Sequence, residues 1–238
     1  MLFRSDSLHA HRTQVATSDA SWDAKNIDIE AKIAEISAID AWVGLRLELC
    51  WAFGMRPKES GHLRPHGAVI GRAQANPRDA AAFPECAEFL RIQHGTKGGR
   101  LRDVPLTTDA QRELLARVTA AVAPGMYVGR PGFTSTQNSA RFYYVIRKCG
   151  IAKKLLGVVA HGLRHQFVND AYEAETGSPS PVRGGVGRPV GDIEARARAA
   201  RLLGHSRTRA TAGYIGAQGR GPAAPSQGSA DSQAGDAP

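Results

Sequence analysis

Six residues in this chain have the types and the order that chemistry on a phosphodiester requires. A late tyrosine follows a Leu-Gly-His-Ser turn, and a His-Gly-Leu-Arg-His run lies upstream of it. A lysine in Thr-Lys-Gly-Gly and an arginine in Arg-Pro-Lys-Glu come earlier still. The six candidates are Arg56, Lys97, His161, Arg164, His205 and Tyr214. Two arginines, a lysine, two histidines and a tyrosine are the groups that a metal-free DNA strand transfer needs.

Each candidate has a role that its chemistry suggests. A tyrosine hydroxyl has an ordinary pKa of about 10, so it needs a base and nearby cations to attack a phosphate. Arg56 and Arg164 suit the non-bridging oxygens, because a guanidinium donates two parallel hydrogen bonds and stays charged. Lys97 is the predicted general acid for the leaving 5′ oxygen. His161 is expected to assist proton transfer and His205 to donate to a phosphate oxygen. No metal and no other cofactor is required.

Each motif also has a purely structural explanation. Arg-x-x-Glu at a helix start is commonly an exposed ion pair, and a lysine beside Gly98-Gly99 is commonly a solvated turn. His161 and His165 are four positions apart, a spacing that also suits zinc on a helix. However, the zinc-protease pattern needs a glutamate where Gly162 stands, and no third ligand is apparent in the sequence.

The other tyrosines are better explained by packing. Tyr143 and Tyr144 lie in an apolar helical pattern, which predicts that they pack against the core. Tyr172 lies eight positions after Arg164 on the same predicted helix, so we expect it to be buried. Tyr214 alone follows the Leu-Gly-His-Ser turn.

Helices are expected to position most of these residues. From Ile27 the pattern turns helical, and one buried face is predicted by the spacing of Ile39, Trp42, Leu45, Leu49, Ala52 and Phe53. Gly54 should end that helix, and Pro57 suits the first turn of the next. Arg56 therefore falls at a sharp junction, from which its side chain can enter a groove.

The region that follows predicts a small antiparallel sheet. Residues 68–70, 89–92 and 102–106 read as short strands. The last two flank Gly98-Gly99, a pair that readily adopts positive φ in a tight hairpin, and Lys97 lies in this turn. Thr108 and Gln111 have capping-box spacing for the next helix.

Further helices are predicted over residues 137–149 and 161–175, and from Asp192, as the cap, to Leu203. Residues 177–191 are rich in Gly, Pro and Arg and are expected to form a loop. Tyr214 should lie on a final short helix. We therefore expect an α+β fold, mainly α, with residues 1–26 as a flexible segment, residues 27–216 as the catalytic domain and residues 217–238 as a disordered tail.

Composition favours an anionic partner. The 238 residues carry a formal net charge of +9, and nucleic acid is the commonest partner of so basic a chain. The three cysteines, Cys50, Cys86 and Cys149, are far apart and are expected to be buried thiols in a reducing compartment. No apolar run has the length of a signal-peptide core or a membrane span, so a cytoplasmic, nucleoid-associated protein without a membrane partner is expected.

In their order, these motifs resemble the catalytic domain of the tyrosine recombinases, also called the phage-integrase family. Residues 56–59 look like the first arginine box, and Lys97, with its Gly-Gly and the strand that follows, matches the hairpin lysine. Residues 161–165 are similar to the second box, while residues 203–206 and Tyr214 match the third. All six catalytic positions of the family are filled.

The resemblance implies a site-specific recombinase that cleaves and rejoins double-stranded DNA through a 3′-phosphotyrosine and assembles on DNA as a tetrameric synapse. Members normally carry an N-terminal helical domain that clamps DNA. Here the first box arrives at Arg56, so we expect that domain to be missing or reduced. Residues 177–191 also lengthen the connection between the second and third boxes, a feature expected in integrases of some integrative mobile elements.

Two other functions fit the same residues. A type IB topoisomerase shares this chemistry but relaxes a single duplex, and the histidine at position 205 favours recombination over it. A non-catalytic DNA-binding remnant would keep the basic groove and lose turnover.

Overall fold

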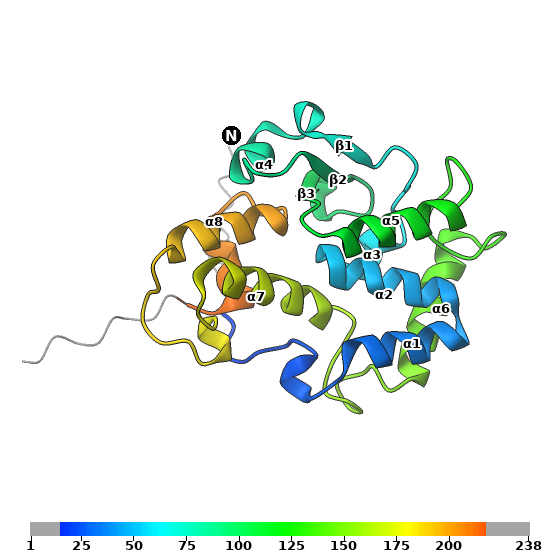
Figure 1. The fold of residues 1–238 in the computed structure, drawn as a ribbon. Helices are drawn as coiled ribbons and strands as arrows, with labels where there is room; N and C mark the ends of the chain where they lie inside the picture. The colour runs from blue at the N-terminus through cyan, green and yellow to red at the C-terminus, as the bar shows by residue number, and fades with distance from the viewer. Residues whose placement is uncertain (1–14, 218–238) are drawn as a thin grey trace, which may run out of the picture.

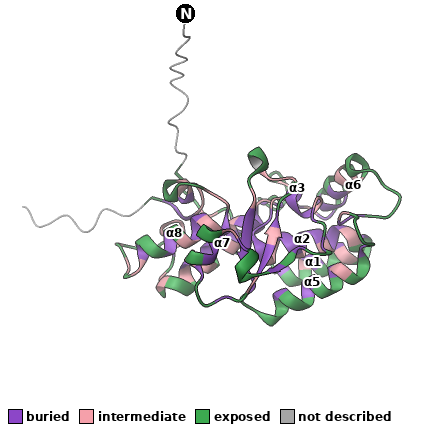
Figure 2. Ribbon diagram, turned by 90° about the horizontal axis from the view of Figure 1, so that it is seen from above, coloured by how far each residue is buried: buried purple, intermediate pink, exposed green. Residues whose placement is uncertain are grey.

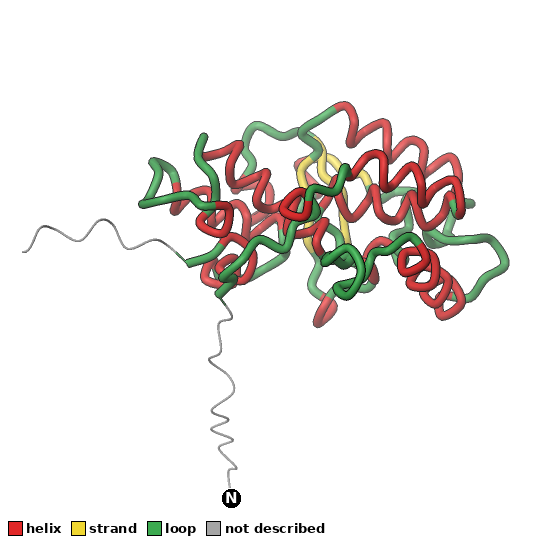
Figure 3. Tube along the Cα trace, turned by 90° about the horizontal axis from the view of Figure 1, so that it is seen from below, coloured by secondary structure: helices red, strands yellow, loops and turns green. Residues whose placement is uncertain are grey.

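The structure describes residues 15–217 of the computed structural model, in which helices predominate over strands and a small sheet lies among the helices (Figures 1 and 3). The helices are α1 (Ile29–Ile39), α2 (Ala41–Phe53), α3 (Pro57–Ser60), α4 (Pro77–Ala82), α5 (Asp109–Ala121), α6 (Ser135–Lys148), α7 (Gly162–Thr176), α8 (Asp192–Leu202) and α9 (Ala212–Ile215). The strands are β1 (Val69–Gly71), β2 (Glu88–Ile92) and β3 (Arg102–Pro105). The predicted class, mainly α with a three-stranded antiparallel sheet, is confirmed.

The first long helix is in fact two helices. Asp40 has extended backbone angles, and its carboxylate accepts hydrogen bonds from the backbone of Trp42 and Val43, so it ends α1 and caps α2. The expectation of one buried face from Ile39 to Phe53 was therefore wrong at its start, because Ile39 ends α1 and is 41% exposed. An aspartate at an N-cap satisfies backbone N–H groups that a continuous helix would not leave free.

The junction after α2 has the predicted form. Gly54 adopts a left-handed conformation at the end of α2, and Pro57 is the first residue of α3. A side chain at Gly54 would collide with the ring of Phe167 on α7. Arg56 stands between the two helices, where the chain changes direction.

The three strands form one antiparallel sheet in the order β1-β2-β3. β2 pairs antiparallel with both β1 and β3, and Leu90 lies opposite Val69 on one side and Val104 on the other. A turn, η3 (Lys97–Gly99), joins β2 to β3, and Gly98 and Gly99 both have positive φ as predicted. The predicted capping box at the next helix is also confirmed, since Thr108 and Gln111 exchange hydrogen bonds.

Two apolar cores hold these elements together, and Figure 2 colours the buried residues purple. The larger core includes residues of α1, α2, the sheet, α5 and α6. The smaller core lies between α7, α8 and α9, and Tyr214 packs against it. α7 contacts both α2 and α8 and so joins the two halves (Figure 1). Cys50, Cys86 and Cys149 are buried free thiols, as expected.

Three further predictions about individual residues have mixed outcomes. Tyr172 is buried, as predicted. Tyr143 and Tyr144 are 46% and 55% exposed, so the prediction that they pack in the core was wrong. Asp192 is not the cap of α8, because Gly191 takes that position and Asp192 is the first residue of the helix, where its carboxylate accepts from the hydroxyl of Tyr172 at 2.6 Å. The helices predicted for these residues are all present, but which of their side chains face the core depends on the distant segments that pack against them.

Part of the N-terminal segment lies within the described chain. Trp22 is fully buried, and its ring nitrogen donates to the carbonyl of Val159 at 3.0 Å. Residues 23–25 form a short 3-10 turn, η1. The rest of the segment expected to be flexible, residues 1–14, and residues 218–238 of the expected tail lie outside the described residues.

Candidate active site

The ring of Tyr214 lies among three histidines from distant parts of the chain. Its centroid is 4.6 Å from that of His165, 5.9 Å from that of His161 and 5.9 Å from that of His205. The guanidinium carbon of Arg164 lies 5.8 Å from the same centroid. Four of the predicted site residues are thus brought together, and His165, which had no assigned role, is the closest histidine to the tyrosine ring.

Three of these side chains come from the N-cap and first turn of α7. His161 precedes the helix, and Arg164 and His165 lie three and four positions later, so all three share one helix face. The backbone at Gly162 is pressed against the N-terminal segment. A Cβ there would lie 2.6 Å from the carbonyl oxygen of Ala20, so only glycine fits this position without a shift.

Arg164 is completely buried and bound to backbone. Its Nη2 donates to the carbonyl of Leu203 at 2.6 Å, and its Nη1 donates to the carbonyl of Gly54. Its Nε has no hydrogen-bond partner within residues 15–217. These contacts fix α7 to the ends of α2 and α8. Burial among other cations lowers the pKa of Arg164 to about 10, with desolvation as the main cause and Arg102 next.

One carboxylate organises the arginines. Glu59 accepts from Nη2 of Arg102 at 2.7 Å and from Nη1 of Arg56 at 2.5 Å, and it lies 3.7 Å from Nη1 of Arg164. It also accepts from the backbone N–H of Arg56 at 2.8 Å. Burial alone would raise the pKa of Glu59, but Arg102 and Arg164, with this backbone bond, lower it to about 2. The side chain is therefore anionic throughout the neutral range.

Arg102 belongs to this network but is not among the six residues predicted from the sequence. It is the first residue of β3, it is 1% exposed, and it also donates to the carbonyls of Leu202 and Gly54. Gly204 must remain small beside it, because a Cβ there would lie 2.9 Å from Cδ of Arg102. The alternation of side chains along a strand could have indicated its burial, because it places Arg102 on the same face as Val104, a core residue.

A cavity of about 380 Å³ opens beside this network. It is lined by Arg56, Glu59, Thr96, Gly98, Arg100, Arg102, Leu203, Gly204 and His205. Arg56 retains 24% side-chain exposure here, as its predicted place at a junction suggested, whereas the side chain of Arg164 is fully buried. The side chain of Lys97 is outside the described residues, but its backbone lies in the turn whose Gly98 lines this cavity.

The histidines around Tyr214 are held neutral. Burial, then His165 and Arg164, lowers the pKa of His161 to about 4. Burial, then Arg164 and Arg56, lowers that of His205 to about 4. The pKa of His165 is also lowered by burial. A neutral imidazole has one nitrogen that accepts a proton, so each of these rings can act as a base at neutral pH.

Two ring nitrogens in this cluster are unpaired. Nδ1 of His165 and Nε2 of His205 are buried and have no hydrogen-bond partner in the described part of the chain. Buried polar atoms are nearly always paired, so these two nitrogens stand out as able to take a further hydrogen-bond partner.

A second, basic cavity of about 150 Å³ lies where the end of α3 meets β1 and β2. Its basic lining residues are His62, Arg64, His66, Arg91 and His94, and none of the described lining residues is acidic. Nη2 of Arg64 donates to the hydroxyl of Tyr127 at 2.8 Å, and the ring of His94 lies edge-on to Tyr127. His94, which lines this cavity, is three positions before Lys97, so the cavity lies beside the same hairpin.

Comparison with known protein families identifies the chain. The model of the family described as "Integrase" matches residues 12–170. The chain belongs to the tyrosine recombinase, or phage integrase, family. The integrase match includes Arg56, Lys97, His161 and Arg164, whereas His205 and Tyr214 lie beyond it. The assignment of these last two rests on their position beside α7.

A search among solved structures matched the chain to one described as a lambda integrase dimer bound to a COC′ core site, with 16% identity and a TM-score of 0.49. The match covers 87% of this integrase chain and 50% of that chain, so this chain spans half the length of the solved one. A search of curated sequences found no match.

Neither a membrane span nor a metal cluster appears in the described integrase chain. Within residues 15–217, no helix is both long and apolar enough to cross a bilayer. The same residues contain no group of three or more His, Cys, Asp or Glu side chains arranged to hold a metal ion.

Proposed function

We propose that this integrase-family chain cleaves and rejoins double-stranded DNA with Tyr214 as the nucleophile. The observation that carries the proposal is the grouping of His161, Arg164 and His205 around the ring of Tyr214. His161 and Arg164 come from the start of α7, and His205 comes from the turn after α8. Tyr214 itself lies on α9. A tyrosine between neutral histidines and buried guanidinium groups has the neighbours that a nucleophile on phosphate requires.

In the proposed reaction, the Tyr214 oxygen attacks the phosphorus and the bond from phosphorus to the 5′ oxygen breaks. The tyrosine proton passes to a neutral histidine, and Lys97 gives a proton to the departing 5′ oxygen. The product is a 3′-phosphotyrosine and a free 5′-hydroxyl. Attack by a new 5′-hydroxyl reverses these steps and joins a new strand. Bond energy is kept in the protein–DNA linkage, so no nucleotide cofactor takes part.

The arginines supply positive charge to the non-bridging oxygens. Arg56 is the best placed, because it lines the 380 Å³ cavity together with His205. Arg164 would reach the phosphate through its unpaired Nε or by exchanging one backbone carbonyl for a phosphate oxygen. A phosphate oxygen is the better acceptor for a guanidinium.

Charge supports DNA as the substrate. The chain has a net charge of +9, and the basic cavity around Arg64 adjoins the hairpin of the proposed site. Residues 27–216 make up the proposed catalytic domain. Exchange of strands between two duplexes requires several protomers, so we also propose that the protein assembles on DNA as a tetramer.

The test is covalent capture of a nicked DNA substrate, from which the short cleaved end diffuses away and prevents rejoining. The wild-type protein should form a complex that survives denaturation, and Tyr214→Phe should bind the DNA but form none. Tyr144→Phe is the matched control, because Tyr144 is an exposed tyrosine on α6, and it should still capture DNA. Capture by Tyr214→Phe would show that another residue is the nucleophile, and no capture by the wild type would favour a DNA-binding remnant.

A further inference from the structure

The long connection between α7 and α8 contains an arginine with an unusual number of partners. Arg183 ends the 3-10 turn η4 (Pro181–Arg183), and its side chain is 16% exposed. It donates to Asp170 at 2.7 Å, Asp19 at 3.0 Å and Glu173 at 3.1 Å. A fourth bond, of 3.2 Å, reaches the hydroxyl of Ser21. The connection is therefore pinned at one point.

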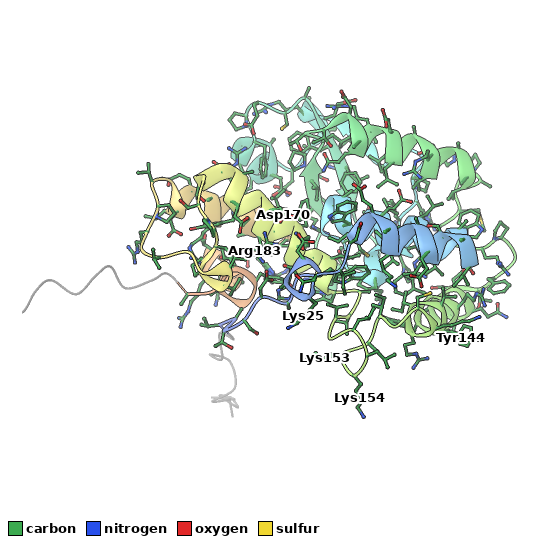
Figure 4. All side chains as sticks on the ribbon, turned by 60° about the horizontal axis from the view of Figure 1, so that its bottom comes forward. Lys25, Tyr144, Lys153, Lys154, Asp170 and Arg183 are labelled. Carbon is green, nitrogen blue, oxygen red and sulfur yellow. The ribbon has the colours of Figure 1, made fainter. Side chains whose placement is uncertain are left out.

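The partners of Arg183 come from two separate segments. Asp170 and Glu173 lie on α7, and Figure 4 shows Arg183 and Asp170 where the connection meets that helix. Asp19 and Ser21 belong to residues 15–22, which we call the N-terminal strap. Without the guanidinium, three carboxylates would be left close together. Burial would raise the pKa of Asp19, but hydrogen bonds from Ser21 and Arg183 lower it.

The strap holds the beginning of α9. The backbone N–H of Ala16 donates to the carbonyl of Ala212 at 2.8 Å, two residues before Tyr214. At its other end the strap passes the start of α7, where the carbonyl of Ala20 packs against Gly162. The strap therefore runs from the start of α9, which carries Tyr214, to the start of α7, which carries His161 and His165.

The connection holds the other end of α9. Gly216, two residues after Tyr214, packs so closely on η4 that a Cβ there would lie 3.1 Å from side-chain atoms of Pro181 and Val182. The hydroxyl of Ser180 donates to Asn169 at 2.6 Å, and the amide of that asparagine lies 3.5 Å from the carbonyl of Tyr214. The residues just before Arg183 thus contact the tyrosine backbone and the residue at which α9 ends.

We propose that Arg183 is a positioning residue that clamps α9 from both sides, so that Tyr214 stays against His161 and His165 of its own chain. A helix of four residues has one turn and does not persist without outside support. The strap and the connection supply that support, and Arg183 is the side chain that joins them. This inference rests on the proposed role of Tyr214 as nucleophile, and it gives the lengthened connection a function.

Two measurements on Arg183→Met test the proposal. Methionine keeps the length and packing of the side chain but removes its charge and donors. The first measurement is the rate of covalent capture at saturating nicked DNA, with the DNA dissociation constant measured separately. We expect the rate to fall on the order of tenfold or more, because a small misplacement of a reacting group is costly, while the dissociation constant stays within about twofold.

The second measurement does not depend on activity. All five tyrosines are labelled with 3-fluorotyrosine, and the fluorine resonance of Tyr214 is assigned by its loss in Tyr214→Phe. In Arg183→Met this resonance should shift or broaden, while the other four stay in place. If the wild-type protein captures no DNA, the proposed function fails, and the resonance still decides whether Arg183 positions α9.

Two further variants complete the test, one in the same network and one outside it. Asp19→Asn removes the charged partner of Arg183 on the strap but leaves its bond to Ser21 and its pairing with Asp170 and Glu173, so it should fold and show the same changes to a smaller degree. Arg198→Met is the matched control, because Arg198 pairs with Glu85 and Glu175 away from α9. An unchanged rate with an unmoved Tyr214 resonance in Arg183→Met would overturn the proposal. Equal losses in Arg198→Met would also overturn it.

Discussion

The carboxylate of Glu59 lies 2.7 Å from Nη2 of Arg102, and the side chains of the pair are 0% and 2% exposed. The same carboxylate binds Arg56 and lies close to Arg164. A residue of the first arginine box, a residue of the hairpin strand and a residue of α7 thus share one buried negative charge. The position of each arginine depends on the others, because moving one would leave an uncompensated charge in the interior.

Loss of that charge should destabilise the fold. Glu59→Gln leaves buried guanidinium groups without their counter-ion, and breaking a buried pair costs about 3–5 kcal/mol. The free energy of unfolding, measured by urea denaturation, should fall by that amount. Glu48→Gln is the control, since its partner Arg117 is 57% exposed, and it should cost under about 1 kcal/mol. Similar small losses in both variants would mean that Glu59 does not organise the arginines.

Lys97→Ala should slow cleavage in a way that depends on the leaving group. A substrate whose bridging 5′ oxygen is replaced by sulfur releases a thiolate, which leaves without a proton. The variant should therefore be strongly slowed on normal DNA and much less so on the sulfur substrate, as measured by covalent capture rates. Lys153→Ala, on the loop between α6 and α7 (Figure 4), should affect both substrates equally, if at all. An equal loss on both substrates in Lys97→Ala would reduce Lys97 to a phosphate contact.

Acid should weaken the fold through the histidines around Tyr214. The pKa values of His161 and His205 fall from an ordinary 6.5 to about 4 in the folded chain. Between these values the unfolded chain binds protons that the folded chain does not. The contribution of the two histidines to the free energy of unfolding is therefore fully present above about pH 6.5 and is lost as the pH falls towards 4. Urea denaturation across this range should show the loss in the wild type and a smaller one in His161→Gln and His205→Gln.

Glu59 provides an internal check on that experiment. Its pKa falls from an ordinary 4.5 to about 2, so its stabilisation is present above pH 4.5 and is lost only as the pH falls towards 2. The histidine variants should therefore differ from the wild type mainly above the range in which Glu59 titrates. An unchanged slope in both variants would show that the histidines titrate alike in the folded and unfolded chain.

Arg64→Gln should weaken DNA binding without changing sequence preference. Arg64 lies in the basic cavity and has no carboxylate partner among the described residues, so its charge is available to a phosphate. Each phosphate contact that is lost should lower the slope of log affinity against log salt by about 1. Arg117→Gln, whose charge is already paired with Glu48, should leave that slope unchanged. Binding by fluorescence anisotropy at several salt concentrations distinguishes the two, and an unaltered slope in Arg64→Gln would place the DNA elsewhere.

Local chemistry made much of the fold predictable from the sequence. Gly54 and Gly98-Gly99 adopt the positive φ that glycine favours, and the capping box at Thr108 and Gln111 satisfies the first backbone donors of α5. Such features depend on neighbours a few positions away, so the sequence states them directly. The six site residues could be predicted for the same reason, because the resemblance to the tyrosine recombinases lies in short motifs.

Tertiary structure alone decided which side of each element faces the core. Asp40 ends a helix that the apolar spacing would continue, and Tyr144 faces solvent where that spacing predicts packing. Arg102 gains its role only because β3 passes beside Glu59, which is 43 positions earlier in the chain. The clamp around α9 is of the same kind, since Arg183 and Asp19 are 164 positions apart. Burial of a charge is tolerated only where opposite charges and carbonyls from distant segments converge, and such convergence is a property of the packed chain rather than of any local pattern.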